Sequence, residues 1–534
     1  MTAPPESRAL VRSSAIRWWA VILVLYFLSR LALFWRAPVF WDEGFYAVQA
    51  QTGLDFPASR FTELLDGKGP LFHWISISFV GAGASPLASV RLVSLLAGLA
   101  TLTATALVAK RLTPGAEYVA GGLYVAMPFF LVHDARGLVD PLLAALMSTA
   151  LLLQLQQAER ARLDRSCALG LVMGAGLLTR DLGLLALVLL PLSLVRFDFA
   201  AESVRTRLTR WTGCSLVSFV LAWLCRAVIH LSPYRPQFAP ARSMSEVLHD
   251  PFANVPAIWP DVSSMLLGYV GLPLLVVLLG VVVFAPNRRL VLLIAVWAAL
   301  PFAAMILFTQ WGYPRYVLPA IGPLTALMSV GLVGIWRDVP SRLSALQSLR
   351  DRPRLVRWIA GGAVVAVLLV PAVLDVRILH HPDTAKYPGE DFYQYAAGWP
   401  SGTGLDVIGH ELDKRAAPGQ TVVASVDFTP WNLAVRFDHP LRVPLGGPQP
   451  YKDGAVAHSR GRTIFFLPYG APHTADAQFV LTQSGFAVPP GFEAAKYKLV
   501  ATYKRPSGAV VQGQPVPRTS LMLFERSPSG EAGR

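Results

Sequence analysis

The chain has 534 residues, of which 54 % are hydrophobic and only 15 % are charged, and its mean hydropathy is +0.47. An ordinary soluble domain carries about 25 % charged residues, so this composition excludes a disordered, collagen-like or coiled-coil chain and favours a membrane protein. The formal net charge is nevertheless +14 at pH 7. A basic chain is also typical of nucleic-acid binding, so the placement of the cations has to decide between the two classes.

Long apolar stretches recur over the first 375 residues and predict about eleven membrane-spanning helices. We place these helices at 18–35, 88–109, 115–132, 141–158, 166–180, 182–195, 212–230, 262–284, 290–309, 317–336 and 358–374. The two stretches between 166 and 195 are separated because Arg180, Asp181 and Gly183 interrupt the apolar run.

The loops between these stretches differ sharply in charge. With the N-terminus in the cytoplasm, the inside loops hold 20 Lys and Arg residues against 8 Asp and Glu residues, and the rest of residues 1–375 holds 11 against 12. Lys and Arg accumulate in cytoplasmic loops, so the pattern predicts a multi-pass protein of the cytoplasmic (inner) membrane in this orientation. Most of the positive charge is thus a topology signal, and we expect no nucleic-acid partner.

Three parts follow from this pattern: a cytoplasmic N-terminal tip (1–17), a transmembrane domain (18–375) whose first outside loop is long (36–87), and a soluble domain (376–534). Pro and Gly recur along the last part. An odd number of spans separates it from the cytoplasmic N-terminus, which places it outside the membrane. A helical pattern and several β-like runs predict an α/β fold for it. They lie at 405–415 and at 421–426, 463–467, 479–482, 499–503 and 521–524. The three cysteines fall in predicted helices, so we expect no disulfide framework and no zinc cluster.

The first outside loop carries two candidate functional positions. Asp42 and Glu43 follow the first helix, and the pair fits a general base, two metal ligands or, with even weight, a helix cap at Asp42. Lys68 stands between two glycines. It fits either a solvated lysine in a turn or a cation that binds a phosphate. It does not have the spacing of a Walker A lysine. The short apolar segment 71–80 predicts a helix that lies at the membrane interface.

The second outside loop is short and rich in ionisable residues. His133, Asp134 and Arg136 stand between two apolar helices, and this density indicates a polar cavity. Asp140 precedes a proline and is better interpreted as the N-cap of the next helix. The long loop 231–261 fits a plain connector or a cover over an acceptor equally well.

Several cations fall in the outer half of the bundle, where the preference for cytoplasmic loops does not explain them. They are Arg30, Arg91, Arg180 and Arg315. Each is long enough to reach the interface on its own, but together they suit an anionic group such as a phosphate.

Taken together, these motifs resemble the GT-C glycosyltransferases, and more narrowly the bacterial group of dolichyl-phosphate-mannose protein mannosyltransferases and aminoarabinose (lipid A) transferases. The resemblance covers roughly residues 15–375. It is carried by Trp41-Asp42-Glu43-Gly44-Phe45-Tyr46-Ala47, Asp66-Gly67-Lys68-Gly69-Pro70-Leu71-Phe72-His73-Trp74-Ile75, Ala88-Ser89-Val90-Arg91-Leu92, Ala135-Arg136 to Asp140-Pro141, Leu177-Leu178-Thr179-Arg180 and Arg315-Tyr316-Val317-Leu318-Pro319. The chain departs from the pattern with Lys-Gly-Pro in place of Lys-Pro-Pro and with Arg180 where a lysine is common.

The resemblance implies an inverting transferase that takes its sugar from a polyprenyl-phosphate donor and acts on the outer face of the membrane. It implies Asp42 as general base with Glu43 assisting, and Lys68 as the phosphate-binding cation with Arg136 and Arg315 near it. The further residues that it places at the cavity are Tyr46, Asp66, His73, His133, Asp134, Arg180 and Tyr316. The acceptor is left open between a protein, a glycolipid and a polymer.

The chemistry of such a transfer needs few groups. A sugar phosphate brings its own leaving group, so one base and cations around the phosphate are sufficient. We therefore expect no obligatory cofactor, although Asp42, Glu43, His133 and Asp134 also offer ligands for a divalent metal. The alternative function is a transporter or flippase for a lipid-linked anion. Its usual sign is a pair of inverted halves, and the sequence shows no such symmetry.

Overall fold

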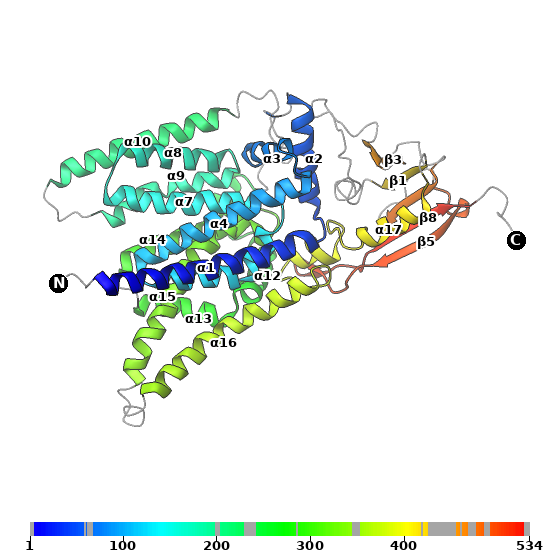
Figure 1. Ribbon diagram of the computed structural model, residues 1–534. Coiled ribbons are helices and arrows are strands. Elements are labelled where there is room, and N and C mark those ends of the chain that lie inside the picture. The colour runs from blue at the N-terminus through cyan, green and yellow to red at the C-terminus, as the bar shows by residue number, and fades with distance from the viewer. Residues whose placement is uncertain are drawn as a thin grey trace.

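The computed structural model describes residues 5–57, 60, 68–197, 203–228, 242–284, 287–343, 353–417, 420–425, 455–459, 462–467, 477–484 and 492–527. In this part of the chain a bundle of long helices forms one end of the molecule and a β-sheet domain forms the other (Figure 1). The predicted class, a polytopic helical membrane protein with a C-terminal α/β domain, is therefore confirmed.

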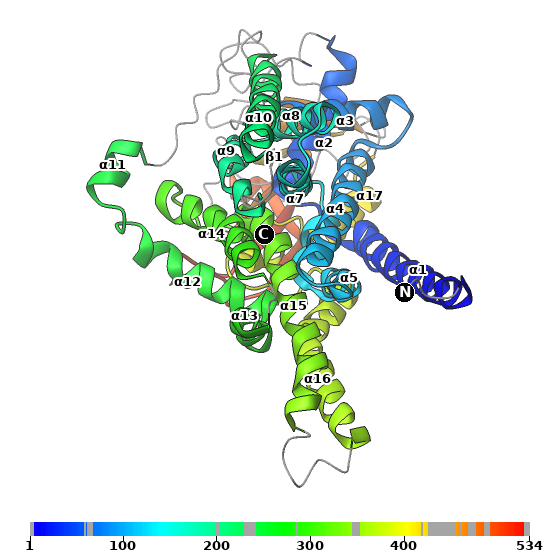
Figure 2. The same ribbon diagram turned by 90° about the vertical axis from the view of Figure 1, so that its left-hand side faces the viewer.

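Six helices of the described chain are long and apolar enough to cross a membrane. Five of them lie within α1 (Pro5–Arg36), α4 (Pro86–Leu112), α7 (Val139–Glu159), α10 (Val204–Ala227) and α14 (Arg288–Phe308). The sixth, Pro314–Arg337, joins a 3₁₀ turn to most of α15 (Leu318–Leu343). The span within α15 is enclosed by the others, with 89 % of its most apolar stretch buried, whereas α1 lies at the edge of the bundle with 28 % (Figure 2). The chain is a multi-pass membrane protein, and the total of eleven spans stays a prediction.

The predicted span 115–132 is wrong as a single helix. The structure divides it into α5 (Ala116–Ala126) and α6 (Pro128–Asp134), each too short to cross a bilayer. The break falls at Met127, whose backbone is extended, with φ −95° and ψ 116°. Proline disfavours helical backbone in the residue before it and has no N–H to donate, so Pro128 begins a new helix instead of continuing the old one.

Two further predicted spans are interrupted for similar reasons. In place of a helix over 182–195, α8 (Leu163–Leu177) is followed by short pieces: Asp181–Gly183, α9 (Leu184–Val188) and Leu190–Arg196, the first and last of them 3₁₀. The predicted helix 262–284 is α12 (Val255–Met265), a π turn (Leu266–Val270) and α13 (Leu272–Phe284), bent by 89°. The bend lies at Gly271, whose φ of +84° favours glycine.

Between the bundle and the sheet domain lie α2 (Trp41–Asp55) and α3 (Leu71–Gly81), and α2 runs across the end of the bundle (Figure 1). The helix α3 coincides with the predicted interface helix. His73 of α3 packs closely against Gly53 of α2. If Gly53 had a Cβ, that atom would lie only 2.8 Å from Nε2 of His73. A short helix, α11 (Met244–His249), stands apart from the bundle (Figure 2).

The C-terminal domain contains a six-stranded sheet in the order β2-β3-β1-β4-β8-β5. Its strands are β1 (Thr421–Ser425), β2 (Ala455–Ser459), β3 (Arg462–Leu467), β4 (Phe479–Gln483), β5 (Tyr497–Lys504) and β8 (Ser520–Arg526). Strand β1 pairs in parallel with β3 and β4, and the other pairs are antiparallel. All five predicted β-like runs match strands, and α17 (Leu405–Arg415) matches the predicted helix.

The two parts of the chain are joined by direct contacts near the start of α2. Helix α16 (Pro353–His380) ends beside α1, where Arg36 donates hydrogen bonds to the carbonyls of Leu379 (2.8 Å) and His380 (2.9 Å). The backbone N–H of Trp41 donates to the carbonyl of Pro400 at 3.0 Å. The segment that follows α16 is therefore held against the end of the bundle.

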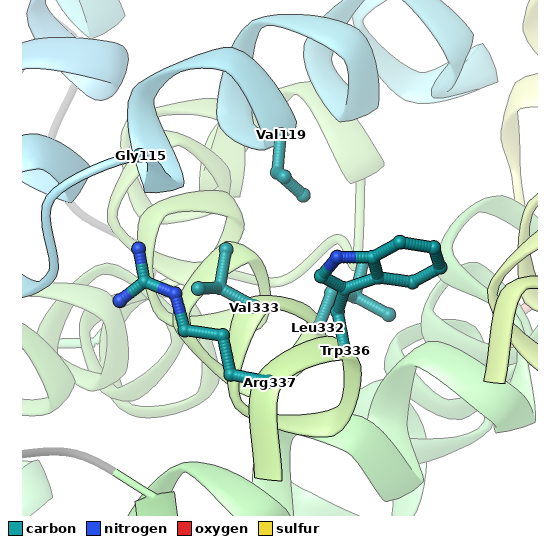
Figure 3. A pocket seen from close by; sticks show the side chains of 6 residues that line it. All are labelled: Gly115, Val119, Leu332, Val333, Trp336 and Arg337. Atoms are coloured by element: carbon teal, nitrogen blue, oxygen red, sulfur yellow. The ribbon is translucent and has the colours of Figure 1, made fainter. Parts of the chain in front are cut away.

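A pocket of about 420 Å³ lies between α5 and the last turns of α15 (Figure 3). It is lined by Gly115, Val119, Leu332, Val333, Trp336 and Arg337. Arg337 stands 22 residues after Arg315, which corresponds to about 33 Å along a helix, so this pocket is at the opposite end of the bundle from the site described below.

Candidate active site

The site is built around the first turn of α2. Phe40 is the N-cap residue, with extended backbone (φ −78°, ψ 153°), and Asp42 is the second residue of the helix. The interpretation of Asp42 as the helix cap is therefore wrong. Its side chain points instead into a group of cations: Oδ2 lies 3.1 Å from Nη2 of Arg315 and 3.5 Å from Nζ of Lys68.

This environment controls the ionisation of Asp42. Burial by itself raises the pKa of a carboxyl, but the charges of Lys68 and Arg315 outweigh it and hold the pKa of Asp42 below its usual value. Only 8 % of Asp42 is exposed. The site thus keeps an ionised carboxylate in a place from which bulk water is largely excluded.

Lys68 is buried, so its interpretation as a solvated turn lysine is wrong. Its ammonium group donates to the hydroxyl of Tyr46 and lies 4.6 Å from the centre of that ring. Burial lowers the pKa of Lys68 to about 8, against the opposing effect of Asp42. Lys68 is therefore mostly protonated at neutral pH.

The turn that carries Lys68 is fixed by backbone contacts with the end of α8. The N–H of Gly69 donates to the carbonyl of Thr179, and the N–H of Leu71 donates to that of Leu178, both at 3.1 Å. A Cβ at position 69 would lie 2.0 Å from the carbonyl oxygen of Leu178, so only glycine fits here. Two motifs that are distant in the sequence are thus held side by side.

Arg180 follows directly on that contact and joins the same group of charges. It pairs with Asp140, and its guanidinium lies 4.3 Å from the centre of the Tyr316 ring. The predicted role of Asp140 as N-cap is wrong, because α7 begins at Val139 with Leu138 as its cap residue. Asp140 instead balances the charge of Arg180.

Arg315 approaches Asp42 from the turn before α15. Besides the carboxylate, it donates to the side-chain oxygen of Gln394 at 2.8 Å and stacks over Phe40 and Tyr313, at 5.0 and 4.9 Å from the ring centres. Gln394 belongs to the segment after α16, so the site is built from the bundle and the C-terminal domain together.

Glu43 stands next to Asp42 but has different surroundings. Its Oε1 accepts from Nε of Arg91 (2.6 Å) and the N–H of Gly137 (2.7 Å), and its Oε2 accepts from Nη2 of Arg91 (2.9 Å) and the N–H of Phe40 (3.2 Å). Both oxygens are occupied and the residue is fully buried. Glu43 thus fastens α2 to α4 and to the loop after α6.

The other predicted residues are divided between two places. Arg136 donates to the hydroxyl of Tyr387 at 3.2 Å and lies 4.1 Å from the centre of the Tyr395 ring, and His133 lies 3.5 Å from Asp391. These two predicted residues are therefore next to the segment that also supplies Gln394.

Asp134 lies elsewhere, 3.6 Å from Arg30 and hydrogen-bonded to Tyr124 inside the bundle. Burial lowers the pKa of His73 to about 4, which keeps it neutral as a packing residue between α2 and α3. Asp66 lies outside the described residues.

Sequence reasoning missed the segment after α16, which contributes Tyr387, Asp391, Gln394 and Tyr395. The available signal was a run of tyrosines and acids at 387–395, between the last predicted membrane helix and the predicted helix 405–415. The four residues considered as metal ligands are separated into different ion pairs, and no group of three or more His, Cys, Asp or Glu suited to a metal occurs in the described part of the chain. Metal independence stays a prediction.

Comparison with known proteins gives a family-model match over part of the chain and a similar overall fold. Residues 67–226 match the family model of dolichyl-phosphate-mannose-protein mannosyltransferases. No curated protein matches the chain. Among solved structures, ArnT from Cupriavidus metallidurans in the apo state is similar with a TM-score of 0.52 and 19 % identity, over 81 % of this chain and 85 % of that one.

Two further structures are similar at lower scores. ArnT from Cupriavidus metallidurans bound to undecaprenyl phosphate has a TM-score of 0.48 with 19 % identity, over 80 % of this chain and 85 % of that one. The Archaeoglobus fulgidus oligosaccharyltransferase in complex with Zn and sulfate has a TM-score of 0.45 with 12 % identity, over 78 % of this chain and 60 % of that one. The apo ArnT comparison establishes the fold.

Proposed function

We propose that this chain, a membrane glycosyltransferase of the GT-C class, moves a sugar with inversion from a polyprenyl-phosphate donor to an acceptor outside the cytoplasmic membrane. The observation that carries the proposal is the carboxylate of Asp42, which lies between the buried cations Lys68 and Arg315 at the end of the bundle. The matched family is named for a dolichyl-phosphate sugar, which is a donor of this kind.

In this proposal the donor phosphate binds among Lys68, Arg180 and Arg315. Arg180 takes the place that the sequence assigned to Arg136, which lies against Tyr387 and Tyr395 instead. Each is a cation held in place by aromatic rings or by an acid, so little movement is needed when the ligand arrives. Preorganised cations stabilise the charge that grows on the leaving phosphate as the bond to the sugar breaks. The polyprenyl chain would leave the site toward the bilayer, between the helices.

Asp42 acts as the general base. An acceptor hydroxyl or amine attacks the anomeric carbon from the face opposite the phosphate, the carbon–oxygen bond to phosphate breaks, and the acceptor proton passes to Asp42. The low pKa of Asp42 belongs to the site without donor. When the phosphate takes over Lys68 and Arg315, the pKa of Asp42 rises and the carboxylate becomes a better base.

We assign the site to the outer face because the inside loops hold the excess of Lys and Arg, and the site lies at the other end of the helices. The C-terminal domain is then outside as well. Its segment with Gln394 contacts Arg315, so it is placed to meet a protein, glycolipid or polymer acceptor as it approaches.

The proposal is tested by mass analysis of cell-envelope glycans in a deletion strain that expresses either the natural chain or Asp42→Asn. Positioned bases contribute about 10²- to 10⁴-fold, so we expect the glycan that is lost on deletion to stay absent with Asp42→Asn. Restoration of this glycan by Asp42→Asn would overturn the mechanism.

The matched control is Asp134→Asn. Asp134 is also a buried carboxylate paired with an arginine, but it lies away from the cations of the site. We expect this variant to restore the glycan in proportion to the amount of protein in the membrane. Loss of the glycan in both variants at normal protein levels would indicate that any buried charge change inactivates the enzyme.

A further inference from the structure

A second group of buried polar side chains lies next to Gln394, the partner of Arg315, and we call it the polar cluster. It consists of His133, Arg136, Asp391 and Tyr395. All four are at most 1 % exposed. His133 comes from the last turn of α6 and Arg136 from the loop after it, and the other two come from the segment after α16. These parts meet at the end of the bundle.

The polar cluster is contiguous with the proposed site. Tyr395 packs edge-on against Phe40, with ring centres 5.1 Å apart, and its neighbour Gln394 accepts from Arg315. Arg315 in turn pairs with Asp42 at 3.1 Å. The phosphate-binding cations and the polar cluster therefore share Arg315 and its neighbours as a common border.

Each member of the polar cluster has one polar atom without a hydrogen-bond partner among the described residues. These atoms are Nε2 of His133, Nε of Arg136, Oδ1 of Asp391 and the hydroxyl of Tyr395. A buried polar group without a partner is destabilising, so four of them together indicate a site that a polar ligand completes.

The mixture of groups defines the ligand chemistry. The cluster offers N–H and O–H donors from Arg136 and Tyr395 and an acceptor from Asp391, and sugar hydroxyls both donate and accept. A phosphate is disfavoured by the Asp391 carboxylate, and a metal cation is disfavoured by Arg136.

We propose that the polar cluster is the subsite that binds the hydroxyl groups of the donor sugar. This inference rests on the proposed function and goes beyond it, because it places sugar selection on a segment of the C-terminal domain. The bundle then binds the lipid phosphate, and the segment around Asp391 and Tyr395 distinguishes one sugar from another.

The sharpest variant is Tyr395→Phe. Its hydroxyl has no partner in the described structure, so its removal costs no hydrogen bond within the described fold. Native mass spectrometry of the purified full chain compares binding of undecaprenyl phosphate with binding of undecaprenyl-phosphate hexoses and pentoses. We expect the natural chain to prefer at least one sugar-bearing lipid, and Tyr395→Phe to lower that preference roughly 2- to 10-fold. Binding of undecaprenyl phosphate itself stays unchanged.

Two controls separate the possible failures. Lys68→Ala should weaken binding of undecaprenyl phosphate and of the sugar-bearing lipids, because all of them carry the phosphate. If none of these lipids binds the natural chain, the proposed function itself is refuted. Tyr497→Phe removes a hydrogen bond to the Ala477 carbonyl inside the C-terminal domain and should lower the melting temperature without changing lipid preference.

Two outcomes would overturn the subsite while leaving the phosphate site intact. One is a natural chain that binds undecaprenyl phosphate but prefers none of the sugar-bearing lipids. The other is an unchanged preference in Tyr395→Phe, which would show that buried water satisfies these atoms instead.

Discussion

The substitution Glu43→Gln separates the two adjacent carboxylates by their roles. Whichever way the new amide is oriented, its NH₂ group replaces one oxygen, so at least one bond from Arg91 and one from a backbone N–H are lost. Arg91 is 2 % exposed and loses its charged partner. Breaking a buried ion pair from one side costs about 3–5 kcal/mol, and we expect a loss of stability of this size.

The measurement is thermal unfolding of the purified chain, with Glu159→Gln as matched control. Glu159 pairs with Arg196 at 3.1 Å, but both are about one-third exposed, so its substitution should cost less than about 1 kcal/mol. A double-mutant cycle of Glu43→Gln with Arg91→Met should show strong coupling. If Glu43→Gln keeps its melting temperature but loses transfer activity, Glu43 acts in the chemistry and the positioning role is refuted.

Further predictions concern the cations and the turn. Burial lowers the pKa of Lys68 to about 8, so its charge is present below that pH and lost above it. The affinity for undecaprenyl phosphate should therefore fall as the pH rises from 8 to 10. Lys68→Arg should abolish this fall, and a fall that persists in Lys68→Arg would contradict the role of Lys68. In Gly69→Ala the new methyl group meets the Leu178 carbonyl at 2.0 Å, so the turn must move, and we expect lipid binding to fall at least tenfold in a binding titration. Gly213→Ala, in helix α10 and with nothing within 4 Å of the new Cβ, controls for replacing a glycine, and unchanged binding in Gly69→Ala would contradict this account.

The fold was predictable where hydrophobicity alone determines an element. The long spans and the strands of the C-terminal domain have a clear apolar period or run. The failures fall where one residue breaks a continuous apolar run: Pro128 divides α5 from α6, and Gly271 allows the 89° bend between α12 and α13. Hydropathy measures how apolar a stretch is and carries no information about these backbone conformations.

The candidate site was predictable in part, for a related reason. Asp42 and Lys68 stand in motifs, and the structure brings them together. Adjacent residues of a helix point about 100° apart, however, so one carboxylate of the pair faces the cations while Glu43 faces Arg91. Sequence spacing alone could not show which of the two carboxylates faces the cations. Tyr395 was missed because only the folded chain returns the segment after α16 to the end of the bundle.

The charges at the site provide a further argument for the proposed reaction. Lys68, Arg180 and Arg315 face two carboxylates, Asp42 and Asp140, which leaves a formal charge of +1. A polyprenyl-phosphate sugar is a phosphodiester with charge −1, so the complex with donor is neutral. Transfer moves one proton to Asp42 and leaves a phosphate monoester, whose charge approaches −2. The site then has a charge of +2, which balances the charge of this product. The complex therefore stays neutral from bound donor to bound product, and no uncompensated charge has to be buried during the transfer.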